Sequence, residues 1–144
     1  GGGDFPEAVD AALDNAIYDH HWREDARARI IFLVLDAPPH ESPEIQARVA
    51  RATREAAARG IRIIPIAGSG INKDTECLMR MLAISTAGSY VFLTDHSGIG
   101  GSHIKPTIGP HNIELLSHLL VKIINRYVQK ADRHDQNTLA QAEK

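Results

Sequence analysis

A run of six apolar residues, Ile30 to Leu35, constrains the fold of this chain more than any other feature, and it ends at Asp36. Apolar and polar residues do not alternate in the run, which is rich in β-branched side chains. It therefore predicts a strand buried on both faces, as in a parallel sheet covered by helices. Ligands of such sheets bind beyond the carboxyl ends of the strands. Asp36 occupies that position, where it either opens a turn or belongs to a site.

Composition excludes several classes of protein. The 144 residues suit one globular domain, and a net charge of −2 gives no electrostatic footprint for nucleic acid. Cys77 is the single cysteine, so the chain has no intrachain disulfide. No apolar run approaches the roughly 20 residues of a membrane span, and these residues contain no signal-peptide pattern, which says nothing of the parent protein.

Helices and strands are predicted to alternate along the rest of the chain. Ser42 is a good N-cap with proline after it, and Gly60 is a typical residue to follow a helix end. Alternation of this kind predicts a parallel sheet with right-handed crossovers and helices on both faces. Besides 30–35, the expected strands are 61–67 and 90–94, and the expected helices are 6–20, 43–59, 73–87 and 112–130.

Two details of these elements are less regular. Pro65 removes a donor from the strand at 61–67, so we expect it at a bulge or beyond the last pairing. In the helix at 73–87, the apolar spacing predicts an inward face. That face consists of Leu78, Met81, Leu82 and Ser85.

Three stretches together resemble the later part of a von Willebrand factor A domain. They are Gly1-Gly2-Gly3-Asp4-Phe5-Pro6-Glu7-Ala8, Phe32-Leu33-Val34-Leu35-Asp36-Ala37 and Gly60-Ile61-Arg62-Ile63-Ile64-Pro65-Ile66. The first stretch, with its Gly-Gly-Gly-Asp-x-Pro-Glu pattern, resembles a bacterial and animal subgroup of the family. The resemblance implies a Rossmann-like three-layer α/β sandwich, with 1–130 as a partial domain that lacks the N-terminal strands and 131–144 as a polar tail or linker. It also implies an extracellular or periplasmic setting.

The resemblance also implies a function. Such domains mostly bind other proteins, often through a divalent cation at the top of the sheet, and act in adhesion. By the family pattern Asp4 belongs to the second ligand segment and Asp36 to the third, so both are metal ligands in the complete domain. The first segment, Asp-x-Ser-x-Ser, does not occur in these residues. We therefore expect Mg²⁺, Ca²⁺ or Mn²⁺ in the complete domain and weak or no binding in this chain.

A nucleotide- or metal-dependent α/β enzyme is the alternative class. It would use Asp36, Asp95 and the turn at Gly68 and Gly70, which resembles part of a dinucleotide-binding fingerprint. Lys73 stands where the third glycine belongs, so an ordinary turn between strand and helix is the better interpretation. None of the eight histidines pairs with Cys77 at a zinc-ligand spacing.

The missing first strand has a consequence for association. In the family that strand lies beside the one ending at Asp36, so Ile30 to Leu35 should form a long apolar edge strand here. Open edges of this kind pair with other chains. We expect either a homodimer, with two copies of this strand antiparallel across a two-fold axis, or association with a missing N-terminal fragment.

Overall fold

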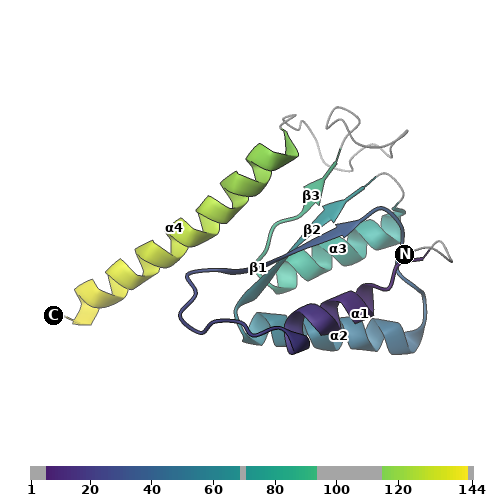
Figure 1. Cartoon of the computed structure of the whole chain (residues 1–144), viewed down its shortest axis with the longest axis horizontal. Helices are drawn as coiled ribbons and strands as arrows, with labels where there is room; N and C mark the ends of the chain where they lie inside the picture. Colours follow the sequence, from purple (N-terminus) through teal and green to yellow (C-terminus); the bar gives the residue numbers. More distant parts are fainter. Residues whose placement is uncertain (1–5, 69–70, 94–114, 143–144) are drawn as a thin grey trace.

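The computed structural model describes residues 6–68, 71–93 and 115–142, with the side chains of the last segment described through Gln129. It is an α/β protein with a parallel three-stranded sheet in the order β1-β2-β3, as the alternating elements predicted (Figure 1). The elements are α1 (Val9–Asp14), the π-helical turn η1 (Asn15–Asp19), β1 (Arg29–Leu35), α2 (Pro43–Ala58), β2 (Ile61–Ala67), α3 (Lys73–Ser85), β3 (Val91–Phe92) and α4 (Leu116–Ala142).

Pairing between β1 and β2 runs along the full length of both strands. It extends from Arg29 opposite Ile61 to Leu35 opposite Ala67. By contrast, β3 is shorter than the predicted 90–94 and pairs only with Ile66 and Ala67. Within the described residues, β1 pairs with no other strand, so its second side is an edge of the sheet.

Pro65 lies inside β2 opposite Leu33, without a bulge, so the expectation for this residue is wrong. The explanation is the direction in which the backbone groups point. The N–H of Ile63 donates to the Thr86 hydroxyl and the carbonyl of Ala67 accepts from Leu93, both on the β3 side. The backbone N–H and C=O groups of successive residues point to opposite sides of a strand, so residues 63, 65 and 67 point the same way. The position of the missing Pro65 N–H therefore also faces β3. Pairing with β3 begins only at the next residue, so the proline costs β2 no ladder bond.

One face of the sheet packs against α1, α2 and α3. Val9 and Leu13 of α1 are buried there, as is Ile17 on η1. The predicted inward face of α3 is partly wrong: Met79 and Ala83 are buried, whereas Met81 is 59% exposed. Two apolar stripes share Leu82 on this helix, and spacing alone does not decide which one packs on the sheet.

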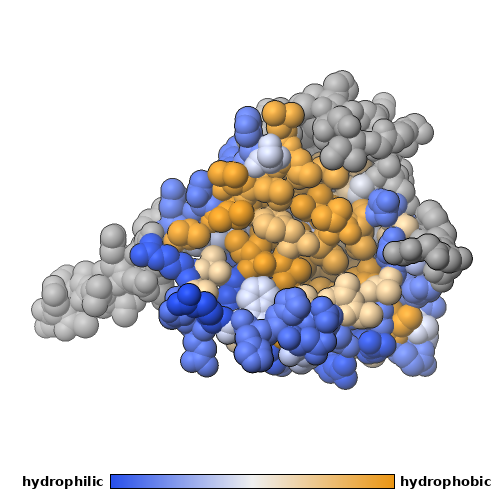
Figure 2. All heavy atoms as spheres, viewed as in Figure 1, coloured by the Kyte–Doolittle hydropathy of each residue, from blue (hydrophilic) through white to orange (hydrophobic). Residues whose placement is uncertain are grey.

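The second face packs against α4, but only in part. Ile123 and Tyr127 of α4 are buried against β2 and β3, and the Tyr127 hydroxyl lies 2.8 Å from that of Ser89. Val34 on β1 remains 63% exposed. Apolar residues gather in one continuous area over the sheet and the neighbouring side of α4 (Figure 2). The described residues therefore cover this face less completely than a full three-layer sandwich would.

At its C-terminal end α4 extends past the rest of the protein (Figure 1). The helix reaches Ala142, so most of the stretch expected as a polar tail continues it. A domain boundary at residue 130 stays a prediction. None of the described helices is long and apolar enough to cross a membrane.

Gly88 provides a test of the packing between the end of α3 and β2. A Cβ at this position would overlap the backbone carbonyl oxygen of Ile63. We predict that Gly88→Ala lowers the free energy of unfolding by about 3 kcal/mol, since the backbone must shift. Gly60→Ala is the control: Gly60 has φ +66, but a Cβ there would meet only the Arg29 guanidinium, at an ordinary contact distance of 3.7 Å. That change should cost only about 1 kcal/mol of left-handed strain. Urea denaturation measures both, and equal losses would contradict the predicted overlap.

Candidate functional site

Asp36 lies at the carboxyl edge of the sheet, immediately after β1, and its side chain is exposed. The Gly68 N–H donates to the Leu35 carbonyl at 2.6 Å, which holds the ends of β1 and β2 together. A Cβ on Gly68 would lie 3.1 Å from the Asp36 Cβ. Any larger residue at position 68 would therefore crowd the Cα and Cβ of Asp36 and the Leu35 carbonyl oxygen.

A segment near the N-terminus runs beside the residues that follow Asp36. The Glu7 N–H donates to the Pro38 carbonyl at 2.8 Å, and the His40 N–H donates to the Glu7 carbonyl at 3.3 Å. These bonds form an isolated parallel bridge between Glu7 and Pro39. The structure thus joins the segment after Asp36 to one that begins shortly after Asp4. Asp4 itself lies outside the described residues, so its place beside Asp36 stays a prediction.

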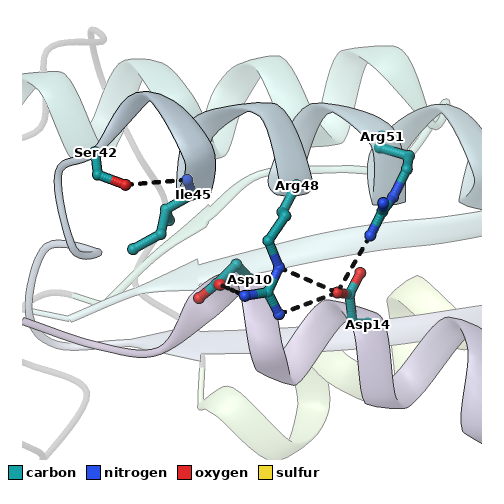
Figure 3. A network of polar contacts seen from close by, with 6 residues as sticks. All are labelled: Asp10, Asp14, Ser42, Ile45, Arg48 and Arg51. Carbon is teal, nitrogen blue, oxygen red and sulfur yellow. Dashed lines mark hydrogen bonds and ion pairs between the residues drawn. The ribbon is translucent and has the colours of Figure 1, made fainter.

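An ion-pair network between α1 and α2 holds this N-terminal segment in place (Figure 3). The Arg48 guanidinium lies 3.0 Å from Asp10, whose side chain is only 7% exposed, and 3.2 Å from Asp14. Arg51 adds a longer contact of 3.6 Å to Asp14. Because α1 begins two residues after Glu7, the network also supports the bridge to Pro39.

This network was not predicted from the sequence. A signal was present. Asp10 and Asp14 are four residues apart on one helix, while Arg48 and Arg51 are three apart on another, so each pair shares a helix face. The sequence could not show that the two faces meet.

Helices α2 and α3 both begin at the edge of the sheet that carries Asp36. The Ser42 hydroxyl accepts from the Ile45 N–H at 3.2 Å, as its predicted role of N-cap requires. Asn72 accepts from the Thr75 N–H at 2.8 Å and caps α3 in the same way. The backbone N–H of Glu44 and the Ser42 hydroxyl hold the pKa of the Glu44 carboxyl below its usual value.

Tyr90 is an ionisable group with a strongly raised pKa, and it lies away from this edge. Burial, together with the nearby charge of Glu76, raises the pKa of Tyr90 to about 12, although Arg80 acts in the opposite direction. The Arg80 guanidinium lies 4.4 Å from the centre of the ring. Since the phenol keeps its proton at neutral pH, it supplies no general base, and we interpret the cluster as structural.

The described residues do not by themselves fit a bound divalent cation. Mg²⁺ takes about six oxygen ligands. In the part of the chain that the structure describes, no three His, Cys, Asp or Glu side chains gather closely enough to hold a metal ion. Asp36 is a single carboxylate, and Asp4 lies outside the described residues. Asp95 and Gly70, which the enzyme alternative needs, lie outside them as well.

Comparisons with known proteins give no family for this chain. No family model matches it, and no curated protein or solved structure matches it either. The resemblance to von Willebrand factor A domains therefore stays a prediction from the sequence.

Substituting Arg48 tests the support of the N-terminal segment. We predict that Arg48→Met lowers the free energy of unfolding by about 1–2 kcal/mol, because the largely buried Asp10 loses its cationic partner. Amide hydrogen exchange at Glu7 and along α1 should be faster in Arg48→Met than in the unaltered protein. Arg51→Met, which removes only the 3.6 Å contact, should cost under about 0.5 kcal/mol. Equal effects of the two substitutions would show that the network does not anchor α1.

Proposed function

We propose that this chain is part of a protein-binding module similar to von Willebrand factor A domains, and that it docks its partner at the sheet edge around Asp36. The supporting observation is the position of Asp36 at the carboxyl end of β1 in a parallel sheet, exposed and beside the Glu7–Pro39 bridge. Loops at this edge are the common location of ligand sites in parallel α/β folds.

In the complete domain, the proposal makes Asp4 and Asp36 ligands of Mg²⁺, Ca²⁺ or Mn²⁺. Carboxylate oxygens are the ligands that these hard cations prefer. The glycine at position 68 leaves the Asp36 side chain room at the edge, and the Glu7–Pro39 bridge brings an N-terminal segment to the residues after Asp36. Both features support a composite site, whose other ligands come from outside the described residues. On its own, this chain should bind the cation weakly or not at all.

The cation proposal is tested in the complete parent protein. Asp36→Ala there should weaken Mg²⁺-dependent partner binding by about tenfold or more while the domain stays folded, because Asp36 is exposed and makes no core contact. Asp25→Ala is the matched control, an exposed acidic residue whose ion pair is with Arg23. Calorimetric titration with and without EDTA measures both. Binding that is unchanged in Asp36→Ala would remove Asp36 from the site.

The open side of β1 supports a second part of the proposal, that the chain associates through Ile30 to Leu35. Leu35 turns its carbonyl toward Gly68, the residue after β2, so the alternate residues Ile30, Phe32 and Val34 direct their backbone groups away from β2. Buried backbone groups need partners, and an apolar edge strand is a template for pairing. A second copy, antiparallel across a two-fold axis, or an N-terminal fragment of the same domain would complete the sheet.

Light scattering tests this association. We predict a species heavier than the 15.7 kDa monomer, and a shift to the monomer in Val34→Lys, because a charge on an edge strand opposes pairing. Val121→Lys on α4 is the control, since Val121 is exposed to a similar extent, 57% against 63%. A stable monomer of the unaltered chain would contradict association between copies. A monomer that binds an added N-terminal fragment would favour the other route.

A further inference from the structure

A groove of about 650 Å³ lies between α2 and α3, on the face of these helices turned away from the sheet. It has an apolar floor of Val49 and Leu82, which are buried, and walls that include Ile45 and Leu78, which are half-buried. Met81, predicted from the sequence to lie in the core, instead stands exposed on the rim. Exposed apolar residues beside a groove are typical of an interaction surface.

Two hydroxyls that line the groove, those of Thr53 and Thr75, are already bonded within the chain. The Thr53 hydroxyl donates to the Val49 carbonyl at 2.7 Å, and the Thr75 hydroxyl bonds Asn72 at 2.8 Å. The buried and half-buried part of the groove therefore contacts an occupant mainly through apolar side chains. The charged residues lie toward the two ends.

The two ends carry opposite charges. Glu41 and Asp74 line the end at which α2 and α3 begin, and Arg54 lines the groove near the end of α2. The groove follows α2 from Ile45 to Ala57, a length of about 18 Å at 1.5 Å per residue. This length accommodates roughly three turns of another helix.

We propose that this groove binds an amphipathic helix of a protein partner, antiparallel to α2 and α3. The proposal is independent of the cation site at Asp36 and of the β1 edge. Apolar side chains at helical spacing would contact Val49, Leu78 and Met81, the common way in which a helix binds a groove. The unbranched Met81 side chain adapts readily to such a partner.

Charge complementarity fixes the direction of the bound helix. Helices are stabilised by acidic residues in their first turn and basic residues in their last. In the antiparallel direction, the acidic turn lies near Arg54 and the basic turn lies near Glu41 and Asp74. The carboxyl end of the bound helix dipole also lies beside the amino ends of α2 and α3, which is favourable. A parallel helix would reverse every one of these contacts.

Two designed peptides test the proposal directly. Both are fluorescein-labelled amphipathic helices of the same composition, with leucine at helical spacing. One has glutamate in the first turn and lysine in the last, and the other has these positions exchanged. Fluorescence anisotropy should show the first peptide binding about fivefold more tightly. The triple variant Glu41→Lys, Asp74→Lys, Arg54→Glu should prefer the second peptide, since all three residues are exposed and their change should leave the fold intact.

A matched pair of substitutions on α3 locates the binding. Met81→Glu should weaken the first peptide about tenfold. Ile84→Glu should leave its affinity unchanged, because Ile84 is 80% exposed on the same helix but does not line the groove. Equal affinity for both peptides, or no effect of Met81→Glu, would overturn the proposal. A third result would also overturn it: neither peptide binds, but the dye 1-anilinonaphthalene-8-sulfonate does, and Met81→Glu abolishes binding of the dye. That result would assign the groove to a small apolar ligand.

Discussion

Parallel pairing between β1 and β2 is the interaction on which the other features of the structure depend. Seven residue pairs fix the register of two almost entirely apolar strands, so each contributes side chains to both faces of the sheet. The same register brings the end of β1 against Gly68, where the chain turns out of β2. Asp36 and the starts of α2 and α3 consequently lie at one edge. A slip of one residue would exchange the two faces and separate these groups.

Helices bury the two faces of this pair of strands to different extents, and the exposed parts are where we propose that partners bind. On the helical face, α1, α2 and α3 bury a continuous core, and Arg48 links the first two of these helices. On the other face, α4 covers β2 and β3 better than it covers β1. The outer side of β1 has no strand beside it in the described part of the chain. Burial is therefore complete between α1, α2 and the sheet, and incomplete where we propose that other polypeptides bind.

Local signals predicted the parts of the fold that local chemistry decides. The apolar run to Leu35, the Ser42 cap and Gly60 with its positive φ define β1 and α2 almost to the residue. The end of the apolar run likewise predicted that Asp36 lies at the carboxyl edge of the sheet. Tertiary contacts decided the rest: the side of β2 on which the Pro65 nitrogen falls, the burial of Met79 instead of Met81, and the pairing of Asp10 with Arg48. Spacing within one element cannot reveal which neighbour it meets.

Amide hydrogen exchange along β1, measured at two protein concentrations, tests the central claim that this strand is an association edge. Residues Ile31, Leu33 and Leu35 point their N–H groups toward β2, and these amides should be protected at both concentrations. The account predicts that the amides of Ile30, Phe32 and Val34 are protected at high concentration and exchange rapidly on dilution. Rapid exchange of these three amides at both concentrations would show that the edge stays open and contradict association between copies of this chain.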